Sequence, residues 1–266
     1  NQMLLNLAEN NHNNLIKHCF SQNLTRNGSC VLNSKIGSNV VLWGDSHALT
    51  IAPELAERFE THGIGLEIFA KAGCVPVPGL FRYDKPECAG YNERVKHYLL
   101  SPESPDVILL TARWANYLNG ERFDNGEGGV EAGEPAIMWP ITSLEDGVER
   151  KKKIADAYKA NIVTLLDAGK TVFLIENIPE VGWNVTHRLV KQRLFDIDQR
   201  EPISTSFDIF EARNAKSTAV WDEIPRNQNL IRIKPYLLFC NTILAGRCIV
   251  QLNGEPGPFI IHVRCI

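Results

Sequence analysis

The sequence lacks long apolar runs, and it carries no strong charge of either sign. No apolar run approaches the roughly 20 residues that a transmembrane helix needs. The net charge of −3 over 266 residues provides no general attraction for nucleic acid or for an anionic membrane surface. These absences favour a water-soluble domain acting on a small neutral or sugar-like substrate. Because the first residue is Asn1, we expect the domain to come from a longer or processed chain.

Several chemical motifs are also absent. No cluster of His, Cys and Asp has the spacing of a metal site, and no Gly-rich loop has a phosphate-binding pattern. The G-x-S-x-G turn of the α/β-hydrolases is missing, because the residue two positions after Ser46 is Ala48. We therefore expect no metal, no other cofactor and no α/β-hydrolase.

The cysteines fall into neighbouring couples, with Cys265 left over. The couples are Cys19 with Cys30, Cys74 with Cys88, and Cys240 with Cys248. None has the C-x-x-C spacing of a zinc or thioredoxin-type site, so three local disulfides are favoured. Such disulfides predict an oxidising compartment, of which a bacterial periplasm fits best. The alternative is a set of buried free thiols in a cytosolic protein.

What is present is the pattern of one large α/β domain. Residues 1–35 are polar and asparagine-rich, and we interpret them as a disulfide-stapled extension of a domain at 36–266. Helical patterns run from about residue 48 to 63 and from 148 to 168. Alternation of strands and helices predicts a parallel sheet with helices on both faces, and ligands then bind beyond the carboxyl ends of its strands. The predicted strands are 39–43, 65–70, 106–112, 171–176 and 230–233.

Ser46 follows the first of these strands in the sequence Leu42-Trp43-Gly44-Asp45-Ser46-His47-Ala48. A serine between a strand and a helix lies near unpaired backbone N–H groups and the positive end of the helix dipole. Both stabilise an oxyanion that forms beside its hydroxyl. The alternative is an ordinary N-cap, because Asp and Ser are both preferred there.

The same turn resembles block I of the SGNH (GDSL-type) hydrolases, specifically the SGNH domain fused to acyltransferase-3 domains of bacterial surface-polysaccharide O-acyltransferases. The resemblance includes Ala72-Gly73-Cys74 and Leu109-Leu110-Thr111-Ala112-Arg113-Trp114. It implies a three-layer α/β sandwich with a short, mainly parallel, flavodoxin-like sheet. By the same resemblance Ser46 is the nucleophile, with its own backbone N–H as one oxyanion donor, and the N–H of Gly73 is a second donor. Tight-turn geometry is the alternative role of Gly73.

Two parts of the family pattern differ in this chain. Arg113 and Trp114 replace the block III asparagine of the wider superfamily, and Asn116 is near enough in sequence to substitute as an amide donor. Arg113 in a surface ion pair and Trp114 in the core or in a sugar-stacking surface are alternatives. The D-x-x-H motif that supplies the general base keeps its histidine at His262 but lacks the aspartate, which predicts an altered or truncated C-terminal end.

The resemblance implies O-acyl transfer through a serine ester. Ser46 would accept an acetyl group delivered by a membrane acyltransferase domain and pass it to a glycan such as lipopolysaccharide O-antigen. The expected location is the periplasm, with a tether to the inner-membrane acyltransferase domain. Two alternatives remain at this point: a carbohydrate acetylesterase, and a catalytically impaired domain that binds or positions glycan.

Overall fold

The structure is a computed structural model that describes residues 29–32, 36–142, 147–185, 187–188, 191, 202–252 and 255–256. Its main strands are β2 (Val40–Gly44), β3 (Leu66–Ala70), β5 (Val107–Thr111), β7 (Thr171–Ile175) and β9 (Leu230–Ile233). Its helices are α2 (Ser46–Glu60), α3 (Glu87–Leu99), α4 (Trp114–Asn119), α5 (Gly147–Asp167), α7 (Phe207–Asp222) and α8 (Tyr236–Phe239). Short strands are β1 (Cys30–Leu32), β4 (Leu80–Phe81), β6 (Trp139–Pro140), β8 (Ser204–Ser206), β10 (Arg247–Ile249), β11 (Gln251–Leu252) and β12 (Glu255–Pro256).

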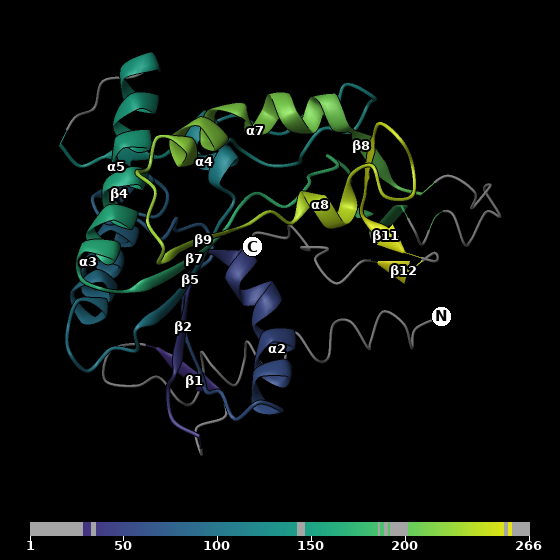
Figure 1. Cartoon of the computed structure of the whole chain (residues 1–266). Helices are drawn as coiled ribbons and strands as arrows, with labels where there is room; N and C mark the ends of the chain where they lie inside the picture. The colour runs from purple at the N-terminus through teal and green to yellow at the C-terminus, as the bar shows by residue number, and fades with distance from the viewer. Residues whose placement is uncertain are drawn as a thin grey trace.

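The main sheet has the order β1-β3-β2-β5-β7-β9, and its strands are parallel except for β1, which pairs antiparallel with β3 (Figure 1). The chain passes from β2 outward to β3 and then returns past β2 to β5. This is the flavodoxin-like order, and β2 lies at its topological switch point. The crevice beyond the carboxyl end of β2 is where ligands bind in such sheets.

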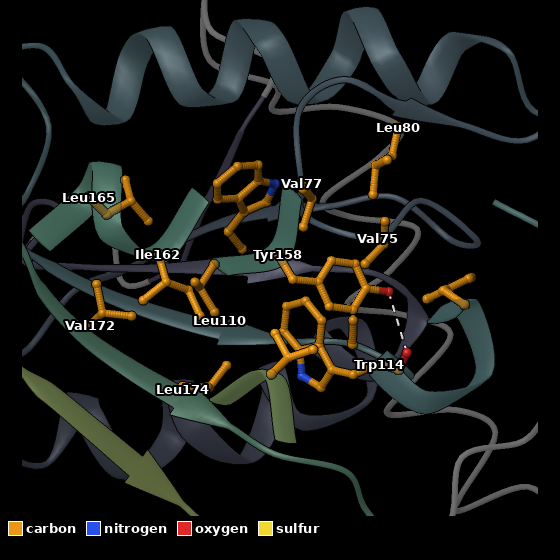
Figure 2. Close-up of a cluster of buried hydrophobic side chains, with 14 of the residues drawn as sticks. Val75, Val77, Leu80, Leu110, Trp114, Tyr158, Ile162, Leu165, Val172 and Leu174 are labelled. Atoms are coloured by element: carbon orange, nitrogen blue, oxygen red, sulfur yellow. Dashed lines mark hydrogen bonds between the residues drawn. The ribbon is translucent and has the colours of Figure 1, made fainter. Parts of the chain in front are cut away.

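Alternate residues of the strands face two separate cores. On one face, Val41 and Trp43 of β2 join side chains from α3, α5 and α7, and Figure 2 shows Trp114 and Tyr158 packed within this core. On the other face, Val40 and Leu42 pack with α2 and β1. Helices therefore cover both faces of the sheet, which confirms the predicted three-layer α/β class.

Each of the five predicted strands is present, with bounds that differ by one residue at most. Helix α5 begins and ends one residue before the predicted range. Cys30 lies in β1, so the described end of the predicted N-terminal extension forms an edge of the main sheet. Within the described ranges, no helix is both long and apolar enough to cross a membrane.

Two of the three predicted disulfides are confirmed: Cys74–Cys88 and Cys240–Cys248. Cys30 is also disulfide-bonded, while its predicted partner Cys19 lies outside the described residues, as does Cys265. The first disulfide ties the loop after β3 to the start of α3, and the second closes the loop between α8 and β10.

Candidate functional site

The candidate site begins at the turn where β2 ends and α2 starts. Ser46 is the first residue of α2 and is half-buried. Gly44 permits this turn, because a Cβ atom there would lie 2.3 Å from the carbonyl oxygen of Thr111 and 2.7 Å from the Cβ of Ala48. The neighbouring strand β5 and the helix therefore approach the turn more closely than any side chain at position 44 allows.

Asp45 joins this turn to the end of β5 and the start of α4. Its buried carboxylate accepts hydrogen bonds from the backbone N–H of His47 (2.8 Å), the backbone N–H of Arg113 (3.1 Å) and the hydroxyl of Tyr117 (2.8 Å). Burial alone would raise the pKa of Asp45, but His47 and these hydrogen bonds lower it below its ordinary value. Burial and the neighbouring Asp45 carboxylate raise the pKa of Tyr117 well above its ordinary value, so Tyr117 stays protonated and donates to Asp45.

Replacing Asp45 by asparagine is expected to lower the free energy of unfolding by about 2 kcal/mol at neutral pH, because one amide N–H must then face a donor inside the turn. The folded-state pKa of Asp45 is depressed, so its stabilisation is complete above 3.8 and is lost as the pH falls through the folded value. The unfolding curves of parent and variant should therefore converge at acid pH. Urea denaturation at several pH values measures this, and a difference between parent and variant that stays unchanged as the pH falls below 3.8 would contradict it.

Two predicted oxyanion donors have backbone N–H groups without a hydrogen-bond partner among the described residues. Asp45 occupies the N–H groups of His47 and Leu49, which leaves the N–H of Ser46 free. In the loop after β3, the N–H of Cys74 donates to the carbonyl of Lys71, and the N–H of Gly73 is free in the same sense. Gly73 has φ +78, a conformation that favours glycine. The loop lies beside the turn, since the N–H of Lys71 donates to the carbonyl of Gly44 at 3.1 Å.

Asn116, on α4, has a fixed amide orientation. The Nη2 of Arg213 donates to its Oδ1 at 3.2 Å, and a guanidinium is only a donor, so the amide NH₂ is the group left to donate elsewhere. Among the described residues this NH₂ donates to no acceptor. Asn116 therefore keeps the property that a third oxyanion donor needs, and that role stays a prediction.

Arg113 is engaged by two carboxylates. Its guanidinium donates to Glu131 at 2.5 Å and to Glu180, and its side chain is only 12% exposed. Glu180 also accepts from the Nε of Arg213 at 3.0 Å. Arg113 therefore resembles the predicted ion-pair alternative, although the pair is buried rather than on the surface. It fixes the loops that carry Glu131 and Glu180 beside the start of α4.

Trp114 lies in the core and not on a substrate-facing surface. Its side chain is 1% exposed, its Nε1 donates to the carbonyl of Ile175 at 2.9 Å, and its ring contacts those of Tyr158 and Trp221 (Figure 2). Sugar stacking requires an accessible ring face, which this position does not offer. Of the roles expected for Trp114, we retain only that of core residue.

The predicted general base, His262, lies outside the described residues. His47 is buried, and its Nδ1 lies 3.4 Å from the Oδ1 of Asp45. This contact places the imidazole ring beside Asp45 within the turn. Within the described ranges, no group of three His, Cys, Asp or Glu side chains is arranged to hold a metal ion.

The hydrogen bonds of Asp45, Tyr117 and Glu180 that hold the site together were not predicted from the sequence. The sequence indicated one role of Asp45, since an aspartate before a helix is a preferred N-cap. It did not indicate that the second carboxylate oxygen accepts hydrogen bonds from Arg113, after β5, and from Tyr117 on α4. Tyr117 lies on α4, four residues after Arg113 at the N-cap of that helix. This spacing places the two residues near the same side of the helix. Glu180 carried no local signal, because both its arginine partners are distant in sequence.

Comparisons with known proteins agree with this geometry. A family model described as "SGNH domain (fused to AT3 domains)" matches residues 18–259. The periplasmic domain of a lipopolysaccharide acetyltransferase from Salmonella ser. Paratyphi A has a similar fold, with a TM-score of 0.51 and 16% sequence identity over 91% of this chain and 77% of that chain. No curated protein matches the sequence. Because the family model covers most of the chain, the chain belongs to the family of SGNH domains that are fused to AT3 domains.

Proposed function

We propose that this domain transfers an O-acetyl group to a hydroxyl of a bacterial surface glycan, such as lipopolysaccharide O-antigen, through an ester on Ser46. The Ser46 oxygen attacks the carbonyl carbon of the donor, its proton passes to the base, and the donor's leaving group departs with a proton from that base. A sugar hydroxyl then attacks the new ester, loses its proton to the base, and releases Ser46 as the free alcohol. Both steps pass through a tetrahedral oxyanion.

The observation that carries the proposal is the setting of Ser46. It begins a helix at the switch point of the sheet, and the N–H groups of Ser46 and Gly73 have no partner among the described residues. Backbone N–H groups of this kind are the donors that stabilise an oxyanion, and removal of one typically slows such reactions about 10² to 10³-fold. His262 is the proposed base, and the amide of Asn116 is the proposed third donor.

The proposed donor is an acyl group supplied by a membrane acyltransferase domain. Membership of a family whose domains are fused to AT3 domains supports this partner. The structural neighbour, a periplasmic domain of a lipopolysaccharide acetyltransferase, supports acetyl as the group, lipopolysaccharide as the acceptor and the periplasm as the location. The disulfides Cys74–Cys88 and Cys240–Cys248 are consistent with that oxidising compartment.

Competition between water and a sugar acceptor tests transfer against hydrolysis. The protein is incubated with isotope-labelled p-nitrophenyl acetate, with and without de-O-acetylated O-antigen polysaccharide. We expect label to appear in the polysaccharide and the release of free acetate to fall by the same amount, because both acceptors react with one acyl-enzyme. NMR of the recovered polysaccharide measures this. Acetate release that is insensitive to polysaccharide would assign the domain as an esterase, and glycan binding without any turnover would assign it as a binding domain.

A further inference from the structure

The short antiparallel pair of β4 and β6 presents an apolar face outside the two cores. Along β6, Met138 and Pro140 are buried, while the alternate residues Ile137, Trp139 and Ile141 point the other way, as the period of a strand requires. Ile137 and Ile141 are exposed, and Trp139 is half-buried. Phe81 of β4 is paired with Trp139 of β6, and Tyr83 follows with 62% of its surface exposed.

The aromatic rings of this face are fixed although they face solvent. The ring of Tyr83 lies 5.4 Å from that of Phe81, nearly edge-on, and 5.6 Å from that of Trp139. The guanidinium of the buried Arg150 lies over the ring of Trp139 at 5.8 Å. A ligand that stacks on these rings would therefore meet side chains that have already lost most of their conformational freedom.

The same segment continues into the candidate site. Arg82 and Lys85 form a bridge that closes a tight turn around Tyr83, and this turn covers the loop of Gly73. A Cβ atom on Gly73 would lie 2.9 Å from the side-chain carbons of Lys85 and 3.4 Å from the Nη1 of Arg82. The proposed oxyanion donor at Gly73 and the exposed ring of Tyr83 are thus parts of one packed unit.

We propose that the β4–β6 face, defined as Phe81, Tyr83, Ile137, Trp139 and Ile141, binds a sugar ring of the acceptor glycan, a role that rests on the proposed function. Aromatic rings carry partial negative charge on their faces, which attracts the C–H groups on the apolar side of a pyranose. Polar side chains beside the face can form hydrogen bonds with the hydroxyl groups of the sugar ring. Arg82 donates to both oxygens of Asp84, at 2.9 and 2.6 Å, so its guanidinium and that carboxylate are held in place at the rim.

Charge and size argue against two other occupants. The exposed carboxylates beside the face are ion-paired, Asp84 with Arg82 and Glu87 with Lys71, so these pairs add no net positive charge that would attract an anionic lipid surface. Five side chains make a smaller surface than the roughly 20 to 30 residues a side, about 800 Å², of a typical stable protein interface. One or two sugar rings fit the face better than a second copy of the chain.

Binding of de-O-acetylated O-antigen polysaccharide, measured by calorimetry in a Ser46→Ala background, tests the proposal without any need for turnover. We expect Tyr83→Ala to weaken binding about tenfold or more, as loss of an aromatic anchor does, and Tyr83→Phe to preserve it. Leu237→Ala is the matched control, because Leu237 is 63% exposed but lies on α8. With Ser46 intact, Tyr83→Ala should raise the KM for the polysaccharide.

Equal binding by Tyr83→Ala and its parent, equal weakening by Leu237→Ala, or no binding of the polysaccharide at all would overturn the proposal. So would a dimer, or binding to vesicles of phosphatidylglycerol, that is lost in Tyr83→Ala, because the face would then serve another copy or a membrane. Failure of the proposed function gives a different result: Ser46→Ala would retain full p-nitrophenyl acetate hydrolysis, whatever the polysaccharide binding of the Tyr83 variants.

Discussion

Replacing Ser46 by alanine is expected to reduce hydrolysis of p-nitrophenyl acetate and acetyl transfer to polysaccharide by about 10³-fold or more, because no ester intermediate forms without the hydroxyl. Intact-protein mass spectrometry after rapid acid quench should detect an acetyl adduct on the parent and none on the variant. Stability should change little, since the Ser46 hydroxyl has no hydrogen-bond partner among the described residues and Asp45 caps the helix.

Ser206 supplies a matched control for this experiment. Ser206 is the last residue of β8 and the N-cap of α7, so it also lies where a strand passes into a helix. Its side chain makes no cap hydrogen bond. Ser206→Ala removes a hydroxyl from a comparable local setting away from the switch point of the sheet, so its activity should equal that of the parent. Parent-level turnover and an acetyl adduct in Ser46→Ala would refute Ser46 as the nucleophile.

Replacing Arg113 by methionine is expected to lower the free energy of unfolding by about 3 to 5 kcal/mol, which is typical when one partner of a buried ion pair is removed. Glu131 and Glu180 would each lose a charged hydrogen bond in a half-buried site. Burial raises the pKa of Glu180, but the charges of Arg113 and Arg213 hold it below its ordinary value of 4.5. Without Arg113 the pKa of Glu180 should rise, so the variant's deficit in the free energy of unfolding should shrink as the pH falls and Glu180 becomes protonated.

Urea unfolding followed by circular dichroism measures this effect, with the exposed pair of Lys152 and Asp156 as the control. Lys152→Met removes an i,i+4 partner in which both side chains are half or more exposed, and such solvent-screened pairs contribute little to stability. A loss in Arg113→Met that is no larger than the loss in Lys152→Met would show that the Arg113 pairs are not effectively buried. The double variant Arg113→Met with Glu131→Gln should lose less free energy of unfolding than the two single variants lose in sum, because the two residues interact.

The strands could be predicted because their signals are local and mutually consistent, whereas their flavodoxin-like order was implied by the resemblance to the SGNH hydrolases. Each main strand is a short apolar run bounded by helical patterns, and a parallel sheet with right-handed crossovers leaves few arrangements. The turn at Ser46 was recognisable for the same reason: Gly44, Asp45 and Ser46 are adjacent in sequence. Helix α7 was not predicted, because its buried positions, Phe210, Asn214 and Ser217 among them, mix polar with apolar residues and form no clear apolar stripe.

The sequence by itself determined the α/β class, the place of Ser46 at the end of the first parallel strand, and two local disulfides. Only the tertiary structure decided that Asp45 is shared between α2 and α4, that Arg113 is enclosed by Glu131 and Glu180, and that Trp114 belongs to the core. The physical reason is distance along the chain. Apolar periodicity and turn chemistry act over a few residues, whereas the burial that sets a carboxylate's partners and its pKa depends on segments brought together when the sheet closes.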